Sequence, residues 1–294
     1  MDVSSLRGRW HSAARAANRP LPDLLSHYTS GIALHGILSS NHLLGGNYAF
    51  VNDRTEFLYS QNLLHAVLDR AAVQHFDPGA DALIKTTKQL FHDSPPDLYI
   101  VCFCEASDLL SQWRGYARGT SRYCIEFKWQ SLKPIAKFSG SNPVIHGPTP
   151  VIYDVDNQEQ ILTELIEEHL AALAREPEDS RPQFAARYAD CLYDCVLPML
   201  ARFKDSVFAE EREWRYILVQ EHRQILDDIT FMAADGIMKP FRVMLEGLHE
   251  RLPIDAIVIG DSPRTRQAEE SARLMLERFG YSAPVKRSAV PLVV

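Results

Sequence analysis

The chain lacks any apolar run near the roughly 20 residues that a membrane-spanning helix requires, so we expect no membrane partner. It also lacks an excess of positive charge: 31 Lys and Arg stand against 38 Asp and Glu, the net charge is −7, and the pI is near 5.9. Dedicated nucleic-acid binders usually have a pI above about 9. That class is therefore disfavoured, although a local basic cleft for a nucleic-acid substrate remains compatible with the sequence.

Common site signatures are missing as well. The sequence has no G-x-G-x-x-G or G-x-x-x-x-G-K phosphate loop, and no Cys-x-x-Cys or His-x-x-x-His pair that would complete a zinc site. We therefore interpret the five cysteines, including Cys191 and Cys195 in a helical segment, as small buried hydrophobic residues in a reducing cytoplasm. Residues 1–20 carry positive charge without an apolar core, which predicts a mobile or helical arm, with an Arg-rich transit peptide as the alternative.

What is present is enough apolar material for a large core. Of the 294 residues, 46% are hydrophobic and 23% are charged, which suits one large domain or two small ones. Strand patterns occur at 24–28, 97–105, 123–127, 214–219, 254–259 and 285–294. They alternate with helical patterns without regular βαβ order, which favours an α+β fold. We expect a single domain over residues 21–294.

Capping residues and apolar periodicity predict the helices. Ser30 caps a helix over 30–38, and Asp53 with Glu56 has the spacing of a capping box before a helix ending near residue 72. Further helices are expected at 80–91 and 109–118, and one begins at 262–263 and ends at Gly280. Amphipathic segments at 159–175 and 182–203, the second interrupted at Pro198, predict a helical insertion over about 155–205 in a β-rich core.

Two short segments carry residue types suited to chemistry. His27 and Tyr28 end the first strand pattern, where an imidazole can hydrogen-bond a ribose hydroxyl and a phenol ring can stack on a flat heterocycle. Glu211 and Glu213 are two positions apart at the start of a strand and therefore face the same side. A carboxylate in such a place can stabilise an oxocarbenium-like transition state. Taken alone, each pair is also explained as core packing or as a solvated charge run, with Arg215 pointing outward.

A third segment, residues 112–116, lies between these two and contains Trp113 and Tyr116. If it is helical, Arg114, Arg118 and Arg122 fall on one face that can hold a pyrophosphate or can be ordinary surface charge. Tyr116 is a candidate for stacking on an aromatic ligand.

The order of these motifs resembles that of the largely bacterial family catalogued as domain of unknown function 2971. The residues that carry the resemblance are His27-Tyr28-Thr29, Asn52-Asp53-Arg54-Thr55-Glu56, Val101-Cys102-Phe103-Cys104-Glu105, Trp113-Arg114-Gly115-Tyr116, Glu211-Arg212-Glu213-Trp214-Arg215 and Val258-Ile259-Gly260. They span roughly residues 22–294. That family in turn resembles the ADP-ribosyltransferase fold of the His-Tyr-Glu type, which implies a split β-sheet core with NAD in a cleft between two small sheets.

The resemblance implies a role for each motif. His27 would hold the nicotinamide ribose, Tyr116 or its rival Tyr28 would stack on nicotinamide, and Glu213 would be the catalytic carboxylate with Glu211 as its accessory. Thr29, Arg114 and Asn52 complete the expected contacts to NAD, which is a co-substrate, and no metal is expected. The implied activity is mono-ADP-ribosyl transfer to a protein or nucleic-acid acceptor, or NAD hydrolysis, by a cytoplasmic bacterial toxin or phage-defence effector with a neutralising antitoxin partner.

Two other classes of function remain open at this point. The chain could be a non-catalytic module that senses a nucleotide or binds a protein through the same cleft. It could also be a nucleotide-processing hydrolase that uses its paired carboxylates with a metal ion.

Overall fold

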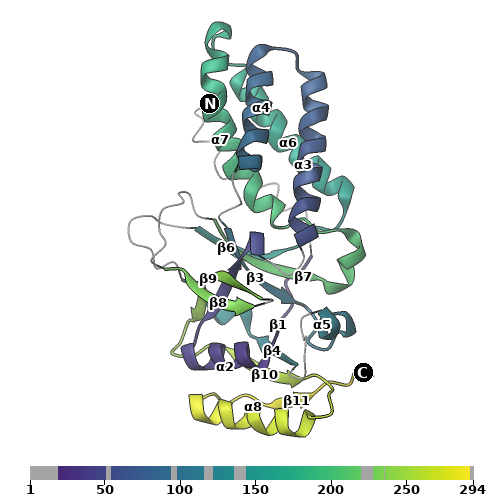
Figure 1. The fold of residues 1–294 in the computed structure, drawn as a ribbon, viewed down its shortest axis with the longest axis vertical. Coiled ribbons are helices and arrows are strands. Elements are labelled where there is room, and N and C mark those ends of the chain that lie inside the picture. The colour runs from purple at the N-terminus through teal and green to yellow at the C-terminus, as the bar shows by residue number, and fades with distance from the viewer. Residues whose placement is uncertain are drawn as a thin grey trace.

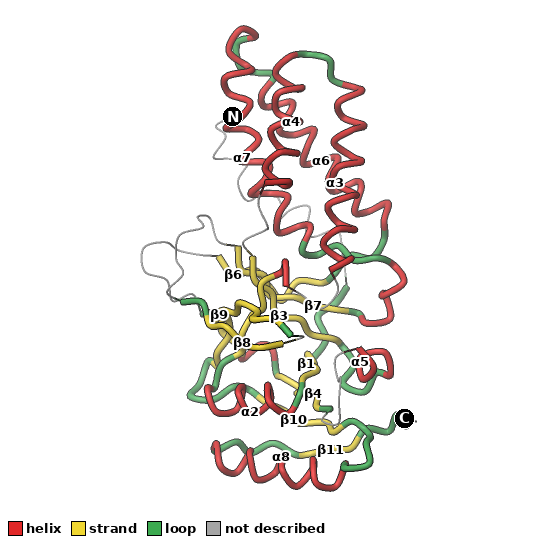
Figure 2. The backbone as a smooth tube through the Cα atoms, viewed as in Figure 1, coloured by secondary structure: helices red, strands yellow, loops and turns green. Residues whose placement is uncertain are grey.

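A layered arrangement of helices and strands positions the site. The computed structural model describes residues 19–50, 54–93, 98–115, 122–135, 144–219, 228–234 and 236–291. In these ranges an open eleven-stranded sheet lies between a bundle of four helices at one end and two helices at the other (Figure 1). Figure 2 shows the same separation of the helical bundle from the strands by secondary structure. The expected α+β class is confirmed.

The sheet is mostly antiparallel, and only β10 and β11 pair in parallel among the described strands. Its order is β11-β10-β4-β1-β3-β2-β9-β5, with β7 also paired to β3 and β6, and β8 paired to β9. The strands are β1 (Leu25–Thr29), β2 (Leu43–Asn47), β3 (Leu98–Cys104), β4 (Tyr123–Phe127), β5 (Leu132–Pro134), β6 (Val144–Pro150), β7 (Glu213–Val219), β8 (Thr230–Ala234), β9 (Ile237–Gly247), β10 (Ile254–Ile259) and β11 (Val285–Arg287).

All the described α-helices except α5, which lies beside the strands, form two groups on opposite sides of this sheet (Figure 1). The α-helices are α2 (Gly31–Ser40), α3 (Arg54–Gln74), α4 (Pro78–Asp93), α5 (Leu110–Gly115), α6 (Val155–Leu173), α7 (Arg181–Leu200) and α8 (Thr265–Phe279). Short 3-10 turns are η3 (Tyr48–Phe50), η4 (Trp129–Ser131), η5 (Glu178–Ser180) and η6 (Ser206–Glu211). The expected helical insertion is therefore only half of the bundle, because α6 and α7 pack against α3 and α4. Among the described helices, none combines the length and the apolarity needed to cross a bilayer.

The side chains of strand β3 show that the sheet is buried on both faces. Successive side chains of a strand point to opposite faces. Leu98 and Ile100 pack in the apolar core shared with the helical bundle, whereas Tyr99, Val101 and Phe103 pack in the core shared with α2 and α8. Both faces of the central strands are therefore covered by helices.

Strands β1 and β2 diverge beside strand β3. Strand β7 pairs with one edge of β3 along its whole length. The other edge is shared, because β2 pairs with it at Tyr99 and Ile100 while β1 pairs with it only at Cys104. The described strands thus form one continuous sheet with a local gap beside the middle of β3, between β1 and β2.

Several local predictions can be compared with the structure. Ser30 caps α2 by accepting a hydrogen bond from the amide of Ala33, and Gly280 ends α8 with a φ of +72°. The predicted interruption at Pro198 is wrong, because α7 continues past this residue and ends at Leu200. The last strand is shorter than predicted: β11 ends at Arg287, and residues 288–291 are not in a strand. Asp53 and most of the expected N-terminal arm lie outside the described residues.

Candidate functional site

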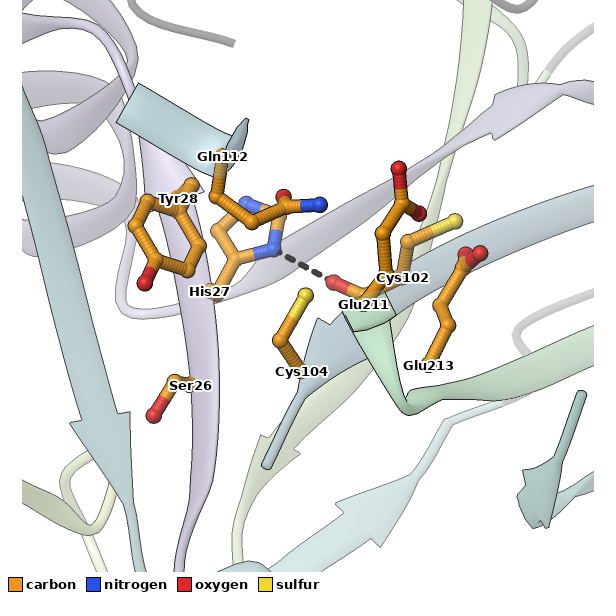
Figure 3. A pocket seen from close by; sticks show the side chains of 8 residues that line it. All are labelled: Ser26, His27, Tyr28, Cys102, Cys104, Gln112, Glu211 and Glu213. Atoms are coloured by element: carbon orange, nitrogen blue, oxygen red, sulfur yellow. Dashed lines mark hydrogen bonds between the residues drawn. The ribbon is translucent and has the colours of Figure 1, made fainter. Parts of the chain in front are cut away.

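A small pocket opens where β1 and β3 part. Its walls come from β1, β3, α5, the last residue of η6 and the first residue of β7 (Figure 3). The lining residues are Ser26, His27, Tyr28, Cys102, Cys104, Gln112, Glu211 and Glu213. The structure thus brings together four of the residues singled out in the sequence, His27, Tyr28, Glu211 and Glu213.

Strand register explains how residues so far apart in the chain meet. Ser26 is paired with Cys104 across β1 and β3, and Cys104 is paired with Glu213 across β3 and β7. One row across the sheet therefore leads from the first strand to the Glu-x-Glu motif. His27 is the next residue along β1, at the edge of the gap.

His27 occupies the gap with a defined tautomer. Its Nδ1 lies 2.9 Å from the backbone oxygen of Cys102, which can only accept, so Nδ1 carries the hydrogen and Nε2 is an acceptor in the neutral ring (Figure 3). The imidazole thereby replaces a strand-to-strand hydrogen bond where β1 leaves β3. Burial lowers the pKa of His27 despite this hydrogen bond, so the ring is neutral at pH 7. Nε2 has no hydrogen-bond partner among the described residues and is available to a ligand hydroxyl.

Tyr28 has a structural role in this arrangement. Its hydroxyl donates to the backbone oxygen of Ala106 at 2.9 Å and accepts from the amide of Leu109 at 2.8 Å. Its ring meets Trp113 edge-on, with 4.8 Å between ring centroids. Burial raises the pKa of Tyr28 well above its ordinary value. Tyr28 therefore fixes the start of α5 beside the pocket.

A buried charge cluster, defined as Glu56, Lys204, Glu211, Glu213 and Arg215, lies behind the pocket. Lys204 Nζ lies 2.6 Å from Glu211, 3.0 Å from Glu213 and 3.5 Å from Glu56. Arg215 donates from Nε and Nη2 to the two oxygens of Glu213 at 2.8 Å and also meets Glu56 at 2.5 Å. Arg215 is 1% exposed, so the alternative of an outward surface charge is wrong.

The two glutamates of the Glu-x-Glu motif differ in their surroundings. Burial alone would raise the pKa of Glu213, but Arg215 and Lys204 outweigh it and hold that pKa well below the usual range. Burial raises the pKa of Glu211, with Lys204 acting in the opposite direction. Among the described residues, Lys204 is the one hydrogen-bond donor to the Glu211 carboxylate. Glu211 is therefore the more available carboxylate at the pocket, and Glu213 is held by cations on both oxygens.

The pocket cysteines are protonated thiols. Burial, followed by the charge of Glu213, raises the pKa values of Cys102 and Cys104 well above the ordinary thiol value. A thiolate nucleophile at neutral pH is therefore disfavoured at this site.

The other predicted residues lie away from these walls. Thr29 is buried at the end of β1, and Arg114 is exposed on α5, and neither lines the pocket. The described part of α5 ends at Gly115, and residues 116–118 of the predicted helix lie outside the described residues. Arg122 is not in a helix, and its guanidinium donates to the backbone oxygen of Asp261. Tyr116, Arg118 and Asn52 lie outside the described residues.

The sequence reasoning missed two contributors. Lys204 follows α7 as an isolated lysine, and no spacing or motif distinguished it. Glu56 was interpreted as half of a capping box, but its side chain is buried and bonded to Arg215 and Tyr48. A signal did exist for Glu56, because it is part of the motif that carries the family resemblance.

Comparison with known proteins supports the family resemblance. Residues 112–216 match the model of the family described as "Protein of unknown function (DUF2971)", and this segment includes Gln112 and both motif glutamates. No curated protein and no solved structure matches the chain.

Proposed function

We propose, for a chain whose residues 112–216 match the DUF2971 family, that the pocket is the reacting end of an NAD-consuming, ADP-ribosyltransferase-like site. The observation that supports this most is the meeting of His27 with Glu211 and Glu213 in one pocket. These are the residue types that the ADP-ribosyltransferase resemblance assigns to the ribose and to the departing nicotinamide.

In this proposal His27 Nε2 accepts a hydrogen bond from a hydroxyl of the nicotinamide ribose. Glu211 stabilises positive charge on the anomeric carbon as the bond to nicotinamide breaks and its electron pair leaves with the nicotinamide. The acceptor nucleophile then bonds to that carbon and loses its proton to Glu211. Glu213, held by Arg215 and Lys204, positions Glu211. The resemblance alone predicted the opposite roles, with Glu213 as the catalytic carboxylate and Glu211 as its accessory.

The size of the pocket sets a condition on this proposal. It encloses about 60 Å³, whereas pockets that bury a small-molecule ligand have roughly 300–1,000 Å³. A ribose hydroxyl fits, but a nicotinamide riboside does not. Binding of NAD therefore requires that a wall opens. The wall formed by α5 is the candidate, because the buried side chain of Gln112 closes the pocket from that helix.

The wider context of the proposal comes from the resemblance. We propose an ADP-ribosyltransferase-like arrangement of the sheet, a protein or nucleic-acid acceptor or water, and a cytoplasmic role as a toxin or defence effector with a neutralising antitoxin partner. Tyr116, Arg114 and Asn52 remain the proposed further contacts to NAD.

The test is incubation of the full chain with NAD and a cell extract, followed by mass spectrometry of free nicotinamide and of ADP-ribosylated products. Glu211→Gln is expected to lower turnover by about 10² to 10³, the usual effect of removing one transition-state contact. Glu210→Gln is the matched control, because this neighbouring glutamate is exposed and does not line the pocket. Equal turnover in the two variants would remove Glu211 from the mechanism.

The small pocket and the doubly bound Glu213 favour one second candidate, a non-catalytic nucleotide-binding module. Isothermal titration of the same protein with NAD distinguishes the two functions. Binding without nicotinamide release, with every acceptor offered, supports the module.

A further inference from the structure

Helices α6 and α7 hold a cluster of three metal-ligating side chains, none of which lines the pocket. His169 lies on α6, and Cys191 and Cys195 lie one turn apart on α7. All three are at most 1% exposed. One ligand atom from each lies within 4.8 Å of the other two. We infer that this cluster binds a thiophilic metal ion, with Zn(II) as the ion that the chemistry favours.

His169 is prepared for this role by its other nitrogen. Nδ1 lies 2.7 Å from the backbone oxygen of Leu165, so it carries the hydrogen and Nε2 has the lone pair. Nε2 is buried and has no hydrogen-bond partner. A buried unsatisfied acceptor is unfavourable, and a backbone carbonyl bound to the second imidazole nitrogen is the usual support of a metal-ligating histidine.

The spacing of the three atoms is close to that of a metal centre. Bond lengths of about 2.0 Å to nitrogen and 2.3 Å to sulfur place ligand atoms roughly 3.5–4 Å apart. A contraction of about 1 Å from the upper limit of 4.8 Å therefore brings the three atoms to ligand spacing, and side-chain rotation can provide it. Cys191 and Cys195 are i and i+4 on one helix, so both sulfurs face α6.

The net charge of the metal ion and its two thiolates favours Zn(II) over Cu(I). Binding converts both thiols to thiolates and releases their two protons to solvent. With Zn(II) the ion and two thiolates are neutral in sum, whereas Cu(I) leaves one negative charge in an apolar core, which is costly. Zn(II) then takes its fourth ligand from outside this trio. The bound ion would join α6 to α7 and stabilise the bundle.

The experiment uses the full chain, stripped of metal with a chelator under reducing conditions and then offered Zn(II) or Cu(I) in turn. We expect one Zn(II) per chain by elemental analysis, a higher thermal midpoint with Zn(II), and a thiolate-to-metal charge-transfer band with Co(II). His169→Leu and Cys191→Ala should each weaken Zn(II) binding by at least about 100-fold. Cys124→Ala is the control, because Cys124 is also buried but lies on β4 in the sheet. This variant should bind Zn(II) as the parent does.

If a variant does not fold, metal binding by the parent chain alone still tests the inference. Less than one tenth of an equivalent of either ion, with no thermal shift and no Co(II) band, overturns the site. Equal Zn(II) affinity in the parent and in folded His169→Leu also overturns it. Binding of Cu(I) without Zn(II) supports the site and overturns the assignment of the ion.

Discussion

Lys204→Met tests the buried charge cluster directly. Three carboxylates lie within 3.5 Å of the Lys204 ammonium, whose side chain is 4% exposed. The substitution leaves Glu56, Glu211 and Glu213 facing Arg215 alone. Removal of one partner from a buried ion pair typically costs about 3–5 kcal/mol. At roughly 2–4 °C per kcal/mol for a domain of this size, the midpoint of thermal unfolding should fall by about 6–20 °C.

The assay is equilibrium unfolding in urea at pH 7, followed by tryptophan fluorescence. Lys85→Met is the matched control, because Lys85 makes its ion pair with Asp81 on the exposed face of α4, where its side chain is 74% exposed. Such exposed pairs contribute about 0–1 kcal/mol. A loss below about 1 kcal/mol in Lys204→Met, or an equal loss in the two variants, would refute the assignment of the cluster as buried and coupled.

The pH dependence adds a second criterion. The folded-state pKa of Glu213 is depressed, so its contribution to stability is present above the ordinary carboxyl pKa of about 4.3 and is lost as the pH falls below it. In Lys204→Met the repulsion among ionised carboxylates is greatest at neutral pH. The difference in unfolding free energy between parent and variant should therefore shrink below about pH 5. Adding Glu211→Gln to Lys204→Met should restore part of the loss at pH 7, because it removes the carboxylate that lies nearest to Lys204 Nζ in the parent.

Three further predictions follow from local structure. His27 should titrate below pH 6.5 by NMR, because burial lowers its pKa; a midpoint above 7 would contradict its neutral state. Cys102 and Cys104 should be alkylated at pH 7 far more slowly in the native chain than in urea, as mass spectrometry can measure. Gly147→Ala should lower the unfolding free energy by about 2–5 kcal/mol, because φ is +137° and the added Cβ would lie 2.6 Å from a backbone oxygen of β7. Gly236→Ala, also at positive φ but with open space around it, should cost only about 1 kcal/mol.

The elements that the sequence predicted well have strong local signals. Strand β4 and strand β10 occupy the predicted ranges 123–127 and 254–259, since their apolar runs are short and clearly bounded. The hairpin of β8 and β9 was missed. The apolar alternation of β9 is interrupted by Lys239, Pro240 and Arg242. This strand is stabilised by its pairing with β2 and β8, and such pairing between distant segments cannot be read from one stretch of sequence.

The site was predictable where residue type and spacing carried the information. Both carboxylates of the Glu-x-Glu motif were expected on one side of a strand, and both do line the pocket. Strand alternation is not the cause, because Glu211 ends η6 and Arg212 turns the chain with a φ of +44° before β7 begins at Glu213. The burial of Arg215 was not predictable from the alternation of β7. An inward Trp214 implies an outward Arg215 only if one face of the sheet is exposed to water, and here helices cover both faces.

The helices on the bundle side of the sheet also affect the charges at the pocket. Glu211 and Glu213 lie at the base of the helical bundle, and their charges are balanced by Lys204, which follows α7, and by Arg215, which also binds Glu56 at the start of α3. Any change in the position of α3 or α7 would therefore alter the number of cations facing the pocket carboxylates and hence the pKa of Glu211. The bundle is coupled electrostatically to the pocket at its base, so a ligand that changes the charge at Glu211 must also change the stability with which the bundle is held against the sheet.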